Sequence, residues 1–229
     1  MPDNETIKKE SKEKVYANLG NVDVLNLVPP TAIYILDIGC GDGANARLLT
    51  QRNCIVDGIT ISEKEKAQAE KILRHVFVHN AENGLPFAGI DLYDAVICSH
   101  VLEHICYPEC IMNDIYRVLK PNGVFIVALP NIMHYRSRWS LIQGNFNYQE
   151  AGIWDFTHFR WYTYATAKLL LKQHNFKIEI ATVTGVLPLY SIFKKILPPP
   201  VNRFLYSILI KISKGFFGYQ LLYKSIKIK

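Results

Sequence analysis

The sequence predicts an α/β protein with a doubly wound, mostly parallel sheet of seven strands. Seven short apolar runs alternate with segments of helical period along most of the 229 residues. Such alternation is typical of βαβ units whose helices cover both faces of a parallel sheet. The first apolar run also ends in a glycine-rich loop, and folds of this class bind ligands at the carboxyl ends of their strands. The length fits one large domain or two small ones.

The expected strands are short, mostly apolar runs bounded by turn residues. They are Ile33–Ile38, Cys54–Ile61, His75–His79, Asp94–Ser99, Val124–Leu129, Phe176–Thr182 and Phe217–Ile228. The expected helices are one or two within residues 3–28, then Ala44–Gln51, Glu63–Leu73, Pro108–Leu119 and Thr163–Asn175.

Local signals predict where several of these elements begin or end. Pro29 and Pro30 close an N-terminal helical segment of residues 1–30, since proline cannot continue a helix. Ser62 followed by Glu65 has the spacing of a capping box at the start of a helix. Residues 120–123, Lys-Pro-Asn-Gly, predict a turn before the fifth strand.

The remaining residues, 31–229, are predicted to form one domain with two unusual segments. Residues 130–163 interrupt the alternation after the fifth strand and are rich in aromatic residues. A long insertion at a strand's carboxyl end is where such folds place binding loops, so we expect it to cover a substrate. Residues 186–215 are apolar with scattered lysines and a run of three prolines.

Composition excludes several classes of protein. Hydrophobic residues make up 49 % of the chain and Gly and Pro number 13 and 11, which argues against a disordered or fibrous protein. The five cysteines include no C-x-x-C pair, which argues against a disulfide scaffold or a structural zinc site and favours a reducing compartment. The charged N-terminus shows no secretory signal, and no apolar run reaches about 18 residues, so we expect a cytoplasmic protein.

Positive charge is concentrated at the C-terminal end of the chain. The net charge is +6, yet the last acidic residue is Glu179. The basic residues after it are Lys194, Lys195, Arg203, Lys211, Lys214, Lys224, Lys227 and Lys229. Segment 186–215 is therefore expected either to form a helical pair that lies on a membrane with anionic lipids, or to be a hydrophobic cover on the sheet or a homodimer interface. We do not expect a nucleic-acid partner, because the basic residues are sparse and no binding module is evident.

Three glycines follow the first predicted strand. Gly39, Gly41 and Gly43 form a G-x-G-x-G loop between a strand and a helix. Glycine permits the tight turn with positive φ and lets a ligand approach the backbone. A dinucleotide site instead has G-x-G-x-x-G and an acid that binds the ribose, which argues against a nicotinamide-dependent oxidoreductase.

The loop and the segments after it resemble those of class I S-adenosylmethionine-dependent methyltransferases. The similar segments, in chain order, are Ile35–Gly43, Val56–Ser62, Asn80–Glu82, Leu85–Phe87, Asp94–His104 and Arg117–Val124. The resemblance implies a Rossmann-like sheet with an antiparallel last strand, and S-adenosylmethionine as cofactor. The implied cofactor-binding residues are Asp37, Gly39, Cys40, Gly41, Thr60, Ile61, Asn80, Ala81, Ser99 and His100.

Thr60 departs from the family pattern. That position usually holds Asp or Glu, which accepts hydrogen bonds from both ribose hydroxyls, and a neutral hydroxyl cannot make this charge-assisted contact. A catalytically inactive cofactor-binding or regulatory protein of the same fold is therefore the alternative to an enzyme.

The insertion resembles a branch of the family associated with glycan and lipid-linked saccharide pathways. The similar residues are 130–136, 144–148 and 152–163, and the end of the chain at 217–222 is similar as well. The resemblance implies methyl transfer to a hydroxyl of a sugar or lipid-linked saccharide. Expected substrate contacts are Tyr135, Tyr148, Trp154, Asp155 and Arg160.

Histidines are the candidate bases, since a hydroxyl acceptor must lose a proton near neutral pH. His100 and His104 follow the fourth strand, and His158 lies in Asp-x-Thr-His-x-Arg within the insertion. We name all three as catalytic candidates, with loop-pinning hydrogen bonds as the structural alternative. His-x-x-Glu-His at residues 100–104 would need further ligands and another fold to bind zinc, so we expect no metal.

Overall fold

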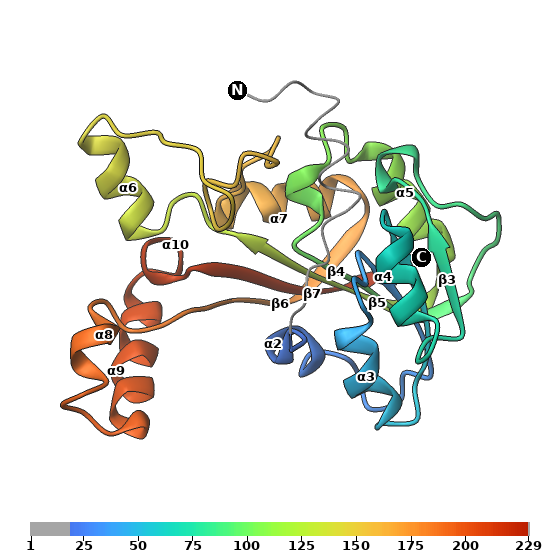
Figure 1. The fold of residues 1–229 in the computed structure, drawn as a ribbon, viewed down its shortest axis with the longest axis horizontal. Helices are drawn as coiled ribbons and strands as arrows, with labels where there is room; N and C mark the ends of the chain where they lie inside the picture. The colour runs from blue at the N-terminus through green and yellow to red at the C-terminus, as the bar shows by residue number, and fades with distance from the viewer. Residues whose placement is uncertain (1–18, 229) are drawn as a thin grey trace.

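The computed structural model describes residues 19–228, and its centre is one seven-stranded sheet with helices on both faces (Figure 1). The strand order is β3-β2-β1-β4-β5-β7-β6. The strands are β1 Tyr34–Ile38, β2 Ile55–Thr60, β3 His75–Val78, β4 Tyr93–Ser99, β5 Leu119–Pro130, β6 Phe176–Thr184 and β7 Gln220–Lys227. Strand β7 is antiparallel to β5 and β6, and the first five strands pair in parallel. The predicted fold class is confirmed.

Helices occupy the connections between the strands. They are α2 Val22–Leu25, α3 Ala44–Thr50, α4 Glu63–Ala69, α5 Glu109–Val118, α6 Tyr135–Ile142, α7 Tyr164–Gln173, α8 Tyr190–Phe193, α9 Pro199–Ile212 and α10 Lys214–Phe217, with 3-10 turns η1 Ala81–Asn83 and η2 Leu102–His104. Within residues 19–228, no helix has the length and apolar character needed to cross a bilayer.

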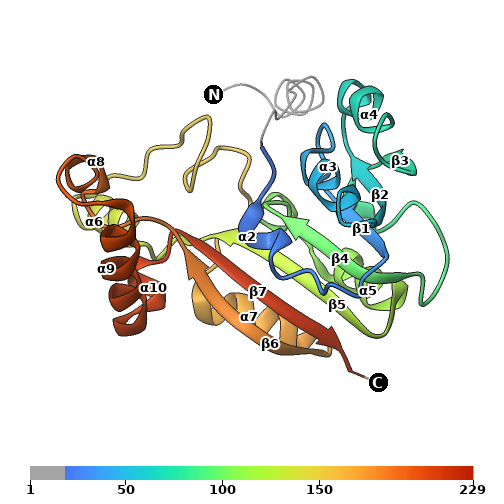
Figure 2. The ribbon, with the colours of Figure 1, turned by 90° about the horizontal axis from the view of Figure 1, so that it is seen from below.

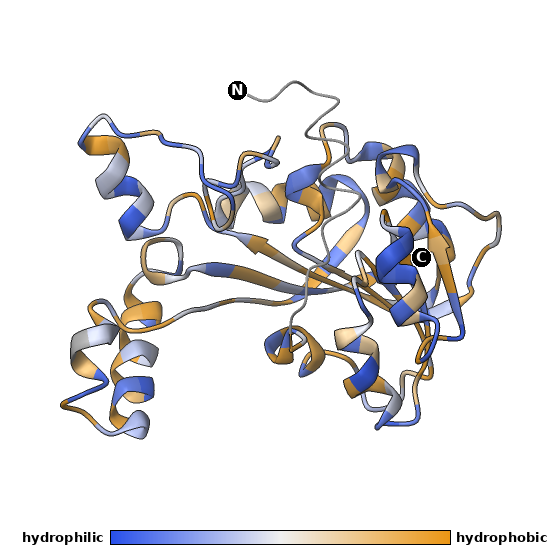
Figure 3. Ribbon diagram, in the orientation of Figure 1, coloured by the Kyte–Doolittle hydropathy of each residue, from blue (hydrophilic) through white to orange (hydrophobic). Residues whose placement is uncertain are grey.

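The sheet separates two hydrophobic cores, because successive side chains of a strand point to opposite faces. Leu36 and Ile38 of β1 belong to the core beneath α5 and α7. Ile35, between them, belongs to the core beneath α2, α3 and α4. Strand β4 and the second half of β5 are mostly orange in Figure 3, as expected for strands buried on both faces.

Two segments differ from the sequence-based expectation. Within residues 19–30 only Val22–Leu25 is helical, and the earlier residues of the expected N-terminal helices lie outside the described chain. Residues 120–123 belong to β5 but bulge from it, because the pairing with β4 passes from Leu119 directly to Val124. The tight turn survives inside this bulge, since Asn122 has φ of 63°.

The segment 186–215 contains two helices, α8 and α9, in agreement with the helical pair that the membrane-surface alternative implied. Pro199 and Pro200 stand at the first positions of α9, where proline's missing N–H costs nothing, so the proline run starts a helix as well as separating segments. Helices α8 and α9 stand at one end of the molecule, beside α10 (Figures 1 and 2).

The insertion after β5 lies on the side toward which β4 and β5 point (Figure 2). It contains α6, which the sequence analysis did not predict. Asn131 fixes its start, because the buried amide donates to the carbonyls of Gly215 and Gly218 at 2.9 and 2.7 Å and accepts from the Met133 N–H. The insertion is thus tied to the C-terminal helices.

Candidate active site at the carboxyl edge of the sheet

The loop between β1 and α3 requires its glycines. Gly39, Gly41 and Gly43 have φ of 75°, 55° and 88°, in the left-handed region that favours glycine. A Cβ at Gly39 would lie only 2.3 Å from Val101 Cγ2. The loop is therefore packed directly against the segment that follows β4.

Asp37, the last but one residue of β1, is fully buried beside this loop. Neither of its carboxylate oxygens has a hydrogen-bond partner among residues 19–228. Burial raises the pKa of Asp37 to about 7, against the opposing effect of the nearby Asn45 amide. A carboxylate left without donors in this way fits a cationic ligand group, such as the ammonium of a bound amino acid.

A carboxylate lies at the end of β2, although position 60 itself holds a threonine. The buried Thr60 hydroxyl donates to the carboxylate of Glu65, which is itself buried on the first turn of α4. Burial and the negative charges of Asp37 and Glu65 raise the pKa of the Cys40 thiol far above its usual range. Glu65 therefore lies close to both Thr60 and the glycine loop.

Sequence reasoning assigned Glu65 only to a capping box, and half of that box forms. Ser62 accepts from the Glu65 N–H at 3.4 Å, but the Glu65 side chain turns to Thr60, and the Ser62 N–H donates to the Thr60 hydroxyl instead. The sequence did contain a signal for this contact: Glu65 is an acid five residues after the neutral Thr60, at the start of the next helix.

The other expected cofactor contacts lie at the ends of neighbouring strands. Strands β3, β2, β1 and β4 are adjacent, so their carboxyl ends share one edge. Ile61 is exposed after β2, and Ala81 is buried at the start of η1. Asn80 accepts from the Glu82 N–H and caps η1, while the Ser99 hydroxyl accepts from Asn21 Nδ2 at 3.1 Å.

His100 is held between two acceptors. Its Nδ1 lies 3.2 Å from Glu103 Oε1 and its Nε2 lies 2.7 Å from Gln220 Oε1 on β7. Gln220 donates its own amide to Thr184, which leaves its oxygen to accept. Burial lowers the pKa of His100, but the hydrogen bonds and charge of Glu103 outweigh this and the net shift is upward. His100 is thus suited to be a cation that orients Glu103, and less suited to be the base that we predicted.

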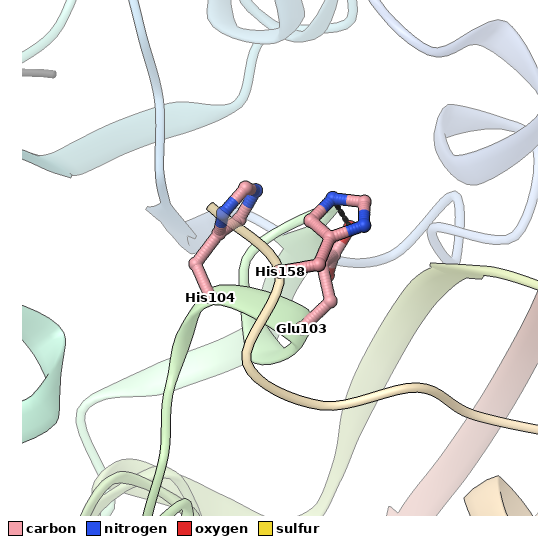
Figure 4. A group of neighbouring side chains, drawn as sticks. All are labelled: Glu103, His104 and His158. Atoms are coloured by element: carbon pink, nitrogen blue, oxygen red, sulfur yellow. Dashed lines mark ion pairs between the residues drawn. The ribbon is translucent and has the colours of Figure 1, made fainter. Parts of the chain in front are cut away.

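Glu103, His104 and His158 form a Glu–His–His cluster (Figure 4). The first two lie on η2 and the third comes from the insertion. His158 Nε2 is 4.0 Å from Glu103 Oε1, and its Nδ1 lies 3.1 Å from the Ile153 carbonyl. Burial lowers the pKa of His158, although the charge of Glu103 opposes the shift. All three predicted catalytic histidines therefore lie around the buried Glu103 carboxylate, with His100 hydrogen-bonded to it and His104 and His158 grouped beside it.

Asp155 does not orient His158 as the sequence suggested. Its carboxylate accepts from the Thr157 hydroxyl at 2.6 Å, and that hydroxyl lies 3.0 Å from His104 Nδ1. The local turn aims Asp155 at Thr157, so the orienting carboxylate acts on the other histidine. Arg160 donates to the Cys106 carbonyl at 2.6 Å and lies 4.0 Å from Glu109, so it fixes the insertion to the start of α5.

The predicted aromatic substrate contacts fall into two places. Tyr148 and Trp154 surround Phe146, with ring centroids 5.4 and 4.5 Å from it, and Trp161 joins the same group at 5.7 Å. Tyr135 instead packs against His134 and Phe216 of α10. Only the first group forms an aromatic cluster within the insertion.

Comparison with known proteins agrees with this geometry. A family described as the methyltransferase domain matches residues 13–180. A ubiquinone biosynthesis O-methyltransferase of Chromobacterium violaceum is 32 % identical over 108 residues, which cover 42 % of this chain and 44 % of that protein. An uncharacterized protein of Methanocaldococcus jannaschii is 35 % identical over 117 residues, covering 49 % of this chain and 43 % of that protein. The chain thus matches less than half of the length of these curated relatives.

The fold is also similar to that of solved methyltransferase structures. A SAM-dependent methyltransferase of Archaeoglobus fulgidus superposes with a TM-score of 0.65 at 20 % identity, over 98 % of this chain and 95 % of that chain. The family match covers well over half of the 229 residues, and it confirms the family and the cofactor class predicted from the glycine loop. Solved structures with a similar fold are described as dependent on S-adenosylmethionine, and the chain belongs to the methyltransferase domain family.

Proposed function

We propose that the protein transfers a methyl group from S-adenosylmethionine to a hydroxyl of a small molecule, and that this molecule is a sugar or lipid-linked saccharide. The observation that carries the proposal is the convergence of Glu103, His104 and His158 at the end of β4, beside the glycine loop. The saccharide class is supported by the resemblance of the insertion, and oxygen as the acceptor atom by the O-methyltransferase among the relatives.

The cofactor half of the site is built from β1 and β2. S-adenosylmethionine supplies an electrophilic methyl group on a positively charged sulfur. Asp37 is suited to its ammonium group, because that carboxylate has no donor of its own among residues 19–228. Glu65, held by Thr60, can accept from the ribose hydroxyls in place of the acid that the family usually has at position 60.

The acceptor half is built from η2 and the insertion. In the neutral rings of His104 and His158, Nδ1 is used by neighbouring oxygens, so each Nε2 has a lone pair to accept from a hydroxyl. The aromatic cluster of Phe146, Tyr148, Trp154 and Trp161 provides apolar surface that can exclude water from an acceptor.

Calorimetry with S-adenosylhomocysteine, followed by a product assay over a panel of saccharide and other hydroxyl acceptors, tests this function. We expect saturable binding and formation of S-adenosylhomocysteine that depends on an acceptor. His158→Ala should lower kcat by about 10²–10⁴-fold while S-adenosylhomocysteine still binds. His174→Ala, on the opposite end of α7 from the insertion, serves as the control with unchanged turnover.

A cofactor-binding protein without turnover is the second candidate. Two observations motivated this candidate: the neutral Thr60 and the absence of a clear base. Glu65 provides the carboxylate that Thr60 lacks, and the Glu–His–His cluster provides candidate bases, so both arguments for it are weaker. Binding of S-adenosylhomocysteine with no product from any acceptor would favour this candidate over the enzyme.

A further inference from the structure

The Glu–His–His cluster contains hydrogen-bond acceptors without matching donors. One ligand atom from each of Glu103, His104 and His158 lies within 4.8 Å of the others. His158 Nε2 and Glu103 Oε1 are 4.0 Å apart, too far for a direct hydrogen bond. Figure 4 shows both imidazoles on the same side of the η2 backbone as the Glu103 carboxylate.

The surroundings of both histidines leave Nε2 available. His158 Nδ1 faces the Ile153 carbonyl, and His104 Nδ1 faces the Thr157 carbonyl at 3.2 Å and the Thr157 hydroxyl at 3.0 Å. A carbonyl can only accept, so the proton of each neutral ring is on Nδ1. Metal-binding histidines commonly use the second nitrogen in this way, which fixes the ring and the free lone pair.

Glu103 provides a second, independent observation. It is fully buried, and its Oε2 has no hydrogen-bond partner within the described part of the chain. Its other oxygen is oriented by His100 at 3.2 Å. A buried carboxylate oxygen without a donor is costly unless a cation or a donor meets it.

We propose that Glu103, His104 and His158 bind one first-row divalent transition-metal ion, such as Zn²⁺ or Co²⁺, through the carboxylate and the two Nε2 atoms. Two imidazoles and one carboxylate suit such ions better than Mg²⁺. Ligand atoms around a four-coordinate ion lie about 3.4 Å apart, so small side-chain rotations close the cluster.

Three protein ligands leave at least one coordination position open. This part of the inference rests on the proposed function: the open position would take the acceptor's hydroxyl oxygen and lower the pKa of that hydroxyl. The histidines would then bind the ion through Nε2 instead of accepting the hydroxyl proton, and that proton would pass to solvent water once the ion has lowered its pKa. The acceptor would be a molecule whose hydroxyl can reach a cation. The sequence argued against a metal because His-x-x-Glu-His at residues 100–104 would need further ligands and another fold. His158, distant along the chain, was not recognised there as such a further ligand.

Titration of metal-free, tag-free protein with Co²⁺ and Zn²⁺ tests the site. Calorimetry should show one ion per chain, and Co²⁺ should give visible absorption bands without a strong thiolate charge-transfer band. Glu103→Gln and His158→Asn should each weaken binding at least about tenfold. Mg²⁺ should show no saturable binding at the same concentrations.

Two controls keep the result interpretable. Cys106→Ser combined with Cys110→Ser removes the two cysteines that are not buried and should leave binding unchanged. Circular dichroism and S-adenosylhomocysteine binding, measured without metal, establish that each variant is folded and test the proposed function separately. The metal proposal is overturned if the unaltered protein binds neither ion, if Glu103→Gln and His158→Asn retain full affinity, or if only the cysteine variant loses it.

Discussion

Asp37 and Asp57 are buried aspartates on the paired strands β1 and β2, and they differ in their hydrogen-bond partners. Asp57 accepts from Arg74 and from Tyr93, the latter at 2.8 Å, and lies 3.2 Å from His75. Burial would raise the pKa of Asp57, but these partners outweigh it and the net shift is downward. Asp37 has no such donors within residues 19–228, and its pKa rises to about 7. Asp57 therefore stabilises the fold through its partners, and Asp37 is the aspartate that we propose for the ligand.

Asp37→Asn should make the ligand-free protein more stable at alkaline pH. The folded pKa lies above the ordinary value of 3.8, so the stability that the protonated group contributes is present below about pH 4 and is lost as the pH rises through about 7. At pH 8 we expect the free energy of unfolding to rise by about 4 kcal/mol, and at pH 4 to change little. Urea denaturation at both pH values measures it.

Asp57→Asn is the matched control and should lower stability at pH 8, because it removes the charge that Arg74 faces. If Asp37→Asn is destabilising at pH 8 as well, Asp37 has a structural partner and our assignment to the ligand is wrong. Asp37→Asn should also weaken binding of S-adenosylhomocysteine.

Glu65→Gln should weaken binding of S-adenosylhomocysteine by about 10–100-fold, since a charged acceptor contributes more than a neutral one. Glutamine keeps an oxygen for Thr60, so the local fold should persist. Glu63→Gln, an exposed neighbour on the same helix, should bind normally. Equal affinities of the two variants, measured by calorimetry, would remove Glu65 from the cofactor site.

At the level of elements, the β1–α3 loop is limited by both conformation and contact. Gly39 and Gly144 share φ of 75°, but a Cβ at Gly144 would meet nothing within 4 Å in the described structure, whereas at Gly39 it would overlap Val101. The two positions therefore separate the cost of a left-handed conformation from the cost of a close approach.

Gly39→Ala should lower the melting temperature and weaken S-adenosylhomocysteine binding at least about tenfold, because a backbone shift is needed to relieve the overlap. Gly144→Ala should cost only the conformational strain of about 1 kcal/mol, with binding unchanged. Thermal denaturation and calorimetry of both variants measure the difference. Comparable losses in the two variants would show that the contact with Val101 is unimportant.

At the level of the whole molecule, α9 leaves an apolar stripe exposed. Val201, Phe204, Ile208 and Ile212 recur at helical spacing and are all exposed, with Arg203 and Lys211 beside them. Figure 3 shows orange and blue residues together on this helix, at the end of the molecule. The pattern fits the expectation of an interfacial helix that attracts anionic lipids.

We therefore expect the protein to sediment with phosphatidylglycerol vesicles at low salt, and less with neutral vesicles or at high salt. Phe204→Glu should abolish sedimentation, since the residue is 64 % exposed on the stripe. Ile90→Glu, at a site 69 % exposed in another part of the molecule, is the control. Dimerisation in analytical ultracentrifugation, lost in Phe204→Glu, without vesicle binding would instead favour the dimer interface.

The sequence by itself determined the seven strands in their order along the chain, most of the helices between the first five strands, the glycine loop and the family. These features depend on local periodicity and on residue types within short windows, such as the three glycines directly after β1. The short connections of βαβ units then place consecutive strands and helices next to one another.

Only the tertiary structure decided which side chains meet. His100 contacts Gln220 across 120 positions, and His158 reaches Glu103 from an insertion without regular period. Glu65 turned toward Thr60 instead of completing its capping box, and Asp155 oriented His104 instead of His158. Such contacts depend on how loops close and pack over the sheet edge, and no local preference of the residues specifies them.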